Sequence, residues 1–285
     1  MKIEFYSDSR KDKNEDIYGV TTYGAFVLDG ASSLINTSYT PGGNDVHWMV
    51  NWWKSYLEDE LDKLDEDIKD ILQRGIESFN QEYGRYTHID RLSSLEQISA
   101  GIAVVRNKGD NFECFVLGDV EITIENNDGV VEVITDTSLK YMDKQVIDMI
   151  SSGEDRESRI VFKGFTEEEL ELLRKNRMKM NINGGYYILG HSVEAIKKGI
   201  YKVYPINQLK RCLLSTDGIN PLDTYYTRGR LLDEMSKRGV KGLISELRSF
   251  EKMDIDKKKI KRLKTHDDAT AVLLGFPSKY KLGAR

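Results

Sequence analysis

Apolar side chains recur at steps of three and four residues from Asp45 onward, which predicts a long amphipathic helix that begins there. The positions expected to face the core are Val46, Met49, Val50, Trp53, Leu57, Leu61 and Leu64. A second helix is predicted over 67–83. Upstream, residues 17–29 alternate polar and apolar side chains and end in Phe26-Val27-Leu28-Asp29, which is typical of a hairpin strand that runs into a core.

The sequence changes character after Leu95, where short β-rich runs replace the helical pattern. Turns such as Asn107-Lys108-Gly109-Asp110 separate these runs and indicate antiparallel strands over 98–106, 112–117, 121–126 and 130–135. Helical patterning returns over 139–151 and 166–178, where Thr166 precedes three glutamates as a capping hydroxyl would. The remaining predicted elements are strands over 186–190, 211–216 and 269–275 and helices over 228–237 and 241–250.

The order of these elements, strands and helices in alternating groups, favours an α+β fold over a parallel βαβ sheet. We therefore expect a central antiparallel β-sandwich flanked by α-helices. The length of 285 residues suits one large domain, so residues 1–285 are expected to form a single domain.

The composition, with 39% hydrophobic and 31% charged residues, is ordinary for a globular protein, and no apolar run is long enough to cross a membrane. The first residues lack the apolar segment of a signal peptide, so we expect a cytoplasmic protein. The formal net charge of −5 disfavours a nucleic-acid partner. Cys114 and Cys212 lie in predicted strands and are expected to be buried, reduced thiols, and the charged run over 254–264 is expected to be a solvated loop or helix end.

Two aspartate-glycine steps each close an apolar, strand-like run, one at Asp29-Gly30 and one at Asp217-Gly218. An aspartate there brings oxygen ligands to the edge of a sheet, and the glycine lets the backbone turn and another group approach closely. Oxygen ligands suit hard divalent cations. Acidic residues also gather at 14–16 and 266–270.

Each acidic cluster alone is typical of a turn, because Asp and Asn cap turns and tolerate unusual backbone angles. The joint pattern is harder to explain that way, because Asp29 and Asp217 follow strongly apolar strands and Asp267 precedes one. Carboxylates that converge would repel one another and raise their pKa values unless cations neutralised them. A pair of Mg²⁺ or Mn²⁺ ions suits such ligands better than zinc, since neither cysteine lies in these clusters.

In this order the clusters resemble the metal-dependent serine/threonine protein phosphatases, the type 2C or PPM family, and its divergent bacterial members in particular. The resemblance spans nearly the whole chain. It rests on Asn14-Glu15-Asp16, Phe26-Val27-Leu28-Asp29-Gly30, Val116-Leu117-Gly118-Asp119, Leu213-Leu214-Ser215-Thr216-Asp217-Gly218 and Asp267-Asp268-Ala269-Thr270.

The resemblance implies four layers, α/β/β/α, with a centre of two Mn²⁺ or Mg²⁺ ions in a cleft at one end. Asp29 would bridge both ions, and the carbonyl group of Gly30 would bind one of them. Asp217 and Asp267 would complete the shell of the other ion. The catalytic residues would then include Asp29 and Asp217.

Further roles follow from the first cluster of the resemblance. Glu15 would hold metal-bound water, and Asp16 would hydrogen-bond the attacking water. Family members usually carry an arginine four residues before the glutamate to hold the substrate phosphate, and this position is Lys11, with Arg10 beside it. A lysine attracts phosphate as a point charge but cannot form the bidentate contact of arginine.

Other positions also depart from the family pattern. Asp268 stands where the family usually has asparagine, so we favour Asp267 as the ligand of the two. Ala31 stands where a histidine could protonate the leaving alcohol, and Pro221 stands where an additional acid often serves a third metal. Asp119 is a candidate to bind such a third ion alone.

The function implied by the resemblance is hydrolysis of phosphoserine and phosphothreonine esters on proteins, with a phosphorylated protein as the substrate partner. Two alternatives stay open. One is a catalytically silent module that binds phosphorylated or protein partners, and the other is a hydrolase of a small phosphorylated metabolite. Residues 140–180 are expected to form a variable insertion over the cleft, because such loops commonly set specificity. The sequence assigns no oligomeric state.

Overall fold

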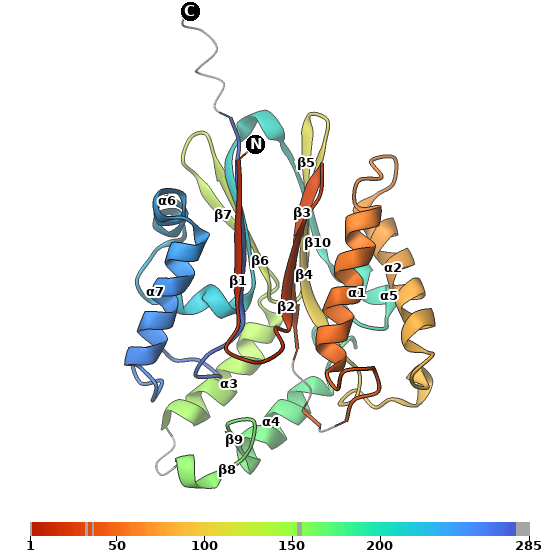
Figure 1. The fold of residues 1–285 in the computed structure, drawn as a ribbon, viewed down its shortest axis with the longest axis vertical. Helices are drawn as coiled ribbons and strands as arrows, with labels where there is room; N and C mark the ends of the chain where they lie inside the picture. Colours follow the sequence, from red (N-terminus) through yellow and green to blue (C-terminus); the bar gives the residue numbers. More distant parts are fainter. Residues whose placement is uncertain (1, 32–33, 36, 153–155, 278–285) are drawn as a thin grey trace, which may run out of the picture.

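Two five-stranded antiparallel sheets pack face to face at the centre of the computed structural model, which describes residues 2–31, 34–35, 37–152 and 156–277 (Figure 1). The first sheet has the order β1 (Lys2–Asp8), β12 (Ala269–Gly275), β11 (Leu209–Ser215), β6 (Glu121–Asn126) and β7 (Val131–Ile134). The second has the order β10 (Ile200–Pro205), β5 (Asn111–Leu117), β4 (Ala100–Lys108), β3 (Gly24–Gly30) and β2 (Asp16–Val20).

Helices cover the outer face of each sheet (Figure 1). Next to the second sheet lie α1 (Asp45–Glu60), α2 (Ile68–Tyr83) and α5 (Val193–Lys198), and next to the first lie α6 (Arg228–Arg238) and α7 (Val240–Met253). The predicted α+β class and its α/β/β/α layers are confirmed. No described helix is long and apolar enough to cross a membrane.

The central strands are apolar on both faces, which explains the continuous hydrophobic runs in the sequence. In β3, Phe26 and Leu28 belong to the core under α1 and α2, whereas Val27 belongs to the core between the sheets. In β11, Leu213 packs under α6 and α7, whereas Leu214 faces the other sheet. Strand ends anchored on both faces hold whatever side chains follow them in fixed positions.

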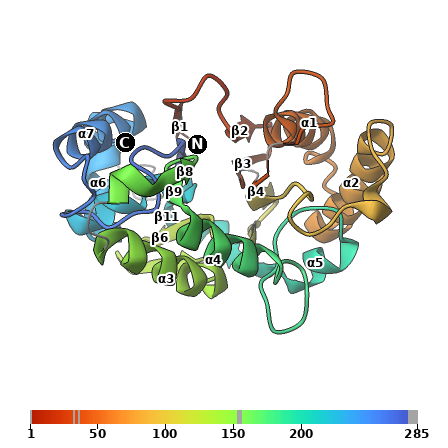
Figure 2. The same ribbon diagram turned by 90° about the horizontal axis from the view of Figure 1, so that it is seen from below.

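Two further helices and a short hairpin lie across one end of the sandwich (Figures 1 and 2). They are α3 (Ser138–Ser152), the hairpin of β8 (Ile160–Phe162) and β9 (Phe165–Thr166), and α4 (Glu167–Arg177). Thr166 and Glu169 form the reciprocal capping box that the sequence suggested for α4. This end segment coincides with the predicted insertion over 140–180, whose variability stays a prediction.

Several predicted elements differ from the structure. Residues 186–190 do not form the predicted strand: Tyr186 and Leu189 make only isolated bridges. Strands β1 and β10 were not expected. The charged run is only partly solvated, because Lys257 and Arg262 are each 7% exposed and the loop wraps around Asp254. The buried, free thiols of Cys114 and Cys212 are confirmed.

Candidate functional site

The acidic residues singled out in the sequence meet at one end of the sandwich because the strands that carry them end there. Asp16 and Asp29 are directly opposite each other in the pairing of β2 with β3. In the other sheet, Asp217 follows β11 and Asp268 precedes β12, and these two strands are paired. The two pairs of strand ends thus bring four separate parts of the chain together.

Two hydrogen bonds connect the sheets at this point. The backbone amide of Asp217 donates to Oδ2 of Asp29 at 3.1 Å, and Oγ1 of Thr216 donates to Oδ2 of Asp16 at 2.7 Å. Asp16 is buried, with 4% of its surface exposed. Asp16 and Asp29, the catalytic candidates from the second sheet, are therefore positioned by the segment that carries the third candidate, Asp217.

Both glycines of the aspartate-glycine steps permit close backbone contacts. A Cβ atom on Gly30 would lie 2.5 Å from the carbonyl oxygen of Glu15, and one on Gly218 would lie 1.8 Å from that of Asp268. The amide of Gly30 also donates to the carbonyl oxygen of Glu15 at 3.0 Å. The glycines keep the segments that carry Glu15 and Asp268 within reach of the strand ends.

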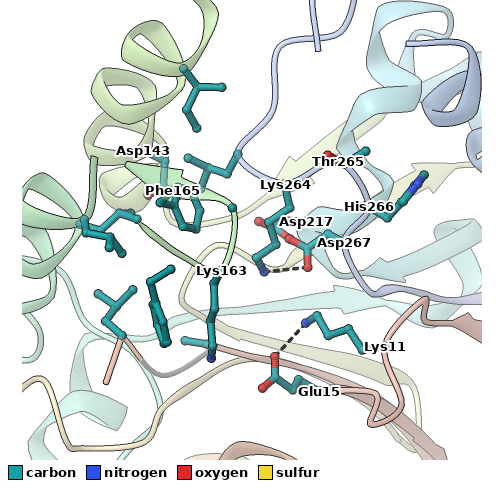
Figure 3. Close-up of a pocket in the computed structure, with 18 of the residues that line it drawn as sticks. Lys11, Glu15, Asp143, Lys163, Phe165, Asp217, Lys264, Thr265, His266 and Asp267 are labelled. Carbon is teal, nitrogen blue, oxygen red and sulfur yellow. Dashed lines mark hydrogen bonds and ion pairs between the residues drawn. The ribbon is translucent and has the colours of Figure 1, made fainter. Parts of the chain in front are cut away.

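A cavity of about 1440 Å³ opens at this end, between the strand ends and the segment of α3, β8, β9 and α4 (Figure 3). Its acidic lining residues include Glu15, Asp29, Asp119, Asp143, Asp217 and Asp267. Its basic lining residues include Arg10, Lys11, Lys163, Arg177 and Lys264. The predicted site residues thus line one cavity, with the exception of Asp16, which is buried beside it.

The surroundings of the carboxylates at this end of the sandwich disfavour their ionised forms. Burial raises the pKa of Asp217 to about 7, and the charge of Asp267 adds to the effect. Burial also raises the pKa of Asp29 well above its ordinary value, with Asp217 the main neighbour that adds to it. For Asp16, burial raises the pKa most strongly, although the hydrogen bond from Thr216 opposes the shift. A cation at this point would stabilise the ionised forms.

The residues fit the divalent ions that the resemblance implies, in the chemistry of their donors. Carboxylate oxygens prefer hard cations such as Mg²⁺ and Mn²⁺, and a cation would oppose the burial and the neighbouring negative charge that raise the pKa values of Asp29 and Asp217. Among the described residues, no three His, Cys, Asp or Glu side chains are already arranged to hold a metal ion. Instead, lysine ammonium groups contact Glu15 and Asp267.

Lys11, the candidate for phosphate binding, pairs with acids in this structure. Its Nζ lies 2.8 Å from Oε2 of Glu15 and 3.0 Å from Oδ2 of Asp268. Asp268 also accepts hydrogen bonds from Oγ of Ser9 at 2.5 Å and from the amide of Glu15 at 3.0 Å. The lysine and the aspartate that depart from the family pattern therefore contact each other. Arg10, the second candidate, lies at the cavity with its side chain 58% exposed.

Sequence reasoning did not single out several charged lining residues, among them three from elements outside the acidic clusters. Asp143 comes from the middle of α3, Lys163 from the tip of the β8–β9 hairpin and Lys264 from the loop before β12. Asp119, a third-metal candidate, lies near Asp143, and burial together with the charge of Asp143 raises its pKa to about 6. A single acid in a helix gives no local signal of this proximity, because only the packing of α3 across the strand ends creates it.

Replacing Gly218 with alanine should destabilise the protein by about 1–3 kcal/mol, because the new Cβ would overlap the carbonyl oxygen of Asp268 at 1.8 Å. Urea denaturation measures the effect. Gly229→Ala is the matched control, because a Cβ there meets only Cγ2 of Val131 at an ordinary 3.5 Å. Equal stability of the two variants would show that the tight contact at Gly218 is not needed.

The contact between Lys11 and Asp268 should appear in a double-mutant cycle. With Lys11→Met and Asp268→Asn, we expect a coupling free energy of about 1 kcal/mol, small because the lysine side chain is 35% exposed. Chemical denaturation of the four proteins gives this energy. The exposed pair of Lys197 and Glu194 serves as the control, with a coupling near zero expected. A coupling at Lys11 no larger than the control would mean that the two residues act independently.

The pH dependence of stability should show that Asp143 binds a proton more tightly in the folded state. Burial raises its pKa from 3.8 to about 7; Asp217 and Asp267 add to the shift, and Lys264 and Arg177 oppose it. The folded state therefore binds the proton more tightly, and the stability that this binding contributes is present below pH 4 and is lost as the pH rises toward 7. In EDTA, the free energy of unfolding should fall less across this range for Asp143→Asn than for the wild type. Identical pH profiles would contradict the assignment.

Comparisons with known proteins agree with this geometry. The sequence matches a family model described as protein phosphatase 2C over residues 9–246, so the last acidic cluster lies beyond the matched region. A search of curated proteins finds no significant match.

Solved structures of bacterial phosphatases share the fold. The serine/threonine phosphatase Stp1 from Staphylococcus aureus is 15% identical, with a TM-score of 0.51 and coverage of 97% of this chain and 95% of that one. PstP from Mycobacterium tuberculosis is 15% identical, with a TM-score of 0.52 and coverage of 95% and 97%. PppA from Pseudomonas aeruginosa is 16% identical, with a TM-score of 0.53 and coverage of 96% and 97%. Because the family model matches most of this chain, the chain belongs to the protein phosphatase 2C family.

Proposed function

We propose that this protein hydrolyses phosphoserine and phosphothreonine esters on proteins and that it needs two divalent ions, Mn²⁺ or Mg²⁺. One observation supports this proposal above the others. Two aspartate-glycine steps from different sheets come together, linked by the hydrogen bond from the amide of Asp217 to Asp29, at the wall of a large cavity. Membership of the phosphatase family makes ester hydrolysis the expected use of such a site.

The residues proposed to bind the ions directly are Asp29, the Gly30 carbonyl group, Asp217 and Asp267, and Glu15 is proposed to hold metal-bound water. A related structure supports the choice of ions, since PstP is described in complex with two manganese ions. When bound, the ions supply positive charge and activate water for attack on phosphorus. These carboxylates would then be stabilised in their ionised forms.

The roles proposed for the other site residues follow from their positions. Asp16 is held by Thr216 through Oδ2, which leaves its other oxygen, Oδ1, as the atom proposed to accept a hydrogen bond from the attacking water. Lys11 and Arg10, from the loop after β1, are the candidates to bind the phosphate. Lys11 would have to exchange its contacts with Glu15 and Asp268 for the phosphate oxygens.

The volume of the cavity helps to choose between a protein substrate and a small phosphorylated metabolite. Sites for small molecules usually measure roughly 300–1,000 Å³, and this cavity is larger, at about 1440 Å³. The size favours a segment of a protein over a small phosphorylated metabolite. A silent binding module is the second candidate, favoured by the ion pairs that hold Glu15 and Asp267. A cytoplasmic location stays a prediction.

Hydrolysis of para-nitrophenyl phosphate and of a phosphothreonine peptide tests the proposal, with Mn²⁺, with Mg²⁺ and with EDTA. We expect turnover only with a divalent ion. Asp217→Asn and Asp29→Asn should each lower kcat by about a hundredfold or more, the order of magnitude for loss of a group that stabilises the transition state. Asp65→Asn, an exposed position between α1 and α2, is the control that should keep wild-type turnover.

Two results would contradict the proposal. Undiminished turnover in EDTA would exclude the metal-dependent mechanism, and wild-type turnover by Asp217→Asn would exclude the assigned site. Absence of any turnover by a folded protein that binds the phosphopeptide would favour the silent binding module.

A further inference from the structure

Lys264 places a positive charge among the carboxylates that are proposed to bind metal. It lies in the loop between α7 and β12, and its Nζ is 2.7 Å from Oδ1 of Asp267 (Figure 3). In the close-up, Asp217 lies beside this pair. No local pattern in the sequence indicated this position, since Lys264 is simply the last residue of a run rich in lysine that begins at Lys257.

Neighbouring acids stabilise the positive charge of the Lys264 ammonium group. Burial opposes its charge, but the carboxylates of Asp267, Asp217 and Asp29 outweigh this effect and raise its pKa above the ordinary value of 10.5. The group is therefore charged at every pH at which the protein would work. A cation that bound Asp217 and Asp267 would meet this charge at close range.

We propose that the Lys264 ammonium group is an internal cation that competes with a divalent ion for Asp217 and Asp267. Metal binds at these carboxylates only when the ammonium group moves away from Asp267. This inference rests on the proposed function, because it concerns the same metal ligands. It deepens that function by naming a residue of the chain that sets the affinity for metal.

The loop around Lys264 is anchored, so the side chain is the part that can move. Asp254 accepts hydrogen bonds from the amide of Ile260 at 2.9 Å and from Nη1 of Arg262 at 2.8 Å. Nζ of Lys257 donates to the carbonyl oxygen of Leu263 at 3.0 Å. The flexible four-carbon stem of a lysine can carry the ammonium group away while this backbone stays in place.

The same loop contacts the segment that closes the cavity. The side chain of Leu263 packs against the cluster formed by Val146, Ile150, Phe165 and Leu170, which belong to α3, β9 and α4. Leu263 directly precedes Lys264. The backbone position of Lys264 is therefore fixed both by its own loop and by the elements opposite the strand ends.

Lys11 makes a different contact and is not the same kind of competitor. It pairs with Asp268, which is not assigned as a ligand, and with Glu15, which is proposed to hold metal-bound water and not to bind an ion directly. Lys264 instead pairs with Asp267, the assigned ligand, and is influenced by Asp217. Replacement of Lys264 is therefore a better test of competition with metal than replacement of Lys11.

Isothermal titration of Mn²⁺ into metal-free protein tests the inference. Lys264→Met should bind Mn²⁺ about tenfold more tightly than the wild type, the factor expected when a charged hydrogen bond of about 1.4 kcal/mol no longer has to be broken. Lys264→Arg keeps the charge and should bind no more tightly than the wild type. Lys261→Met is the control for loss of one lysine charge in the same loop, because its side chain is 61% exposed.

Thermal denaturation supplies a second measure that includes the stability of the variants. In EDTA, Lys264→Met should have a lower Tm than the wild type, because Asp267 and Asp217 lose their counter-charge. Added Mn²⁺ should raise its Tm by more than it raises that of the wild type. If Lys264→Met bound Mn²⁺ equally or more weakly, or if neither protein bound it, the inference would be overturned.

Turnover by the wild type decides the proposed function separately. Metal-dependent turnover together with equal Mn²⁺ affinities would overturn the competition and leave the phosphatase proposal standing. Tighter Mn²⁺ binding by Lys264→Met without hydrolysis by either protein would support the competition and overturn the phosphatase proposal.

Discussion

The burial of several carboxylates close together at the joined ends of two sheets is the constraint on which this site depends. Burial and neighbouring negative charge raise the pKa values of Asp16, Asp29 and Asp217, so the protein must supply or recruit positive charge there. The chain supplies part of it through lysines. Lys264 contacts Asp267, and Lys11 contacts Glu15 and Asp268. The site is thus a balance between acids that the fold brings together and cations that hold them there.

The sandwich makes this arrangement possible because it is rigid where the acids are attached. The strands before Asp29 and Asp217 are packed on both faces, so their ends cannot move apart without loss of hydrophobic contacts. The glycines after these aspartates allow backbones to approach to distances that a side chain would block. Repulsion is therefore opposed by packing several residues away, and the energy of the core stabilises the geometry of the site.

Sequence reasoning succeeded where a local pattern reflects burial. The apolar run before Asp29 and the helical spacing after Asp45 predicted β3 and α1, because a core-facing element needs a regular row of apolar side chains. It missed β1 and β10, which lie at sheet edges; the residues of β1 are mostly half-buried and those of β10 are mostly exposed. Partial exposure removes the periodicity on which such a prediction relies. The isolated bridges at 186–190 show the converse, since a short apolar run can be buried without joining a sheet.

The acids of the site could be predicted from the sequence, but their counter-charges could not. Asp29 and Asp217 each end a strand, and this local feature is visible without a structure. Lys264 becomes part of the site only because the loop folded around Asp254 turns it toward β12. Lys11 and Asp268 had separate interpretations in the sequence, as a weak phosphate ligand and an ambiguous metal ligand. Their contact at 3.0 Å makes them one feature, because a lysine in place of the usual arginine is matched by an aspartate in place of the usual asparagine. A divergent phosphatase site is therefore better compared with its family by its pairs of charges than by its residues one at a time.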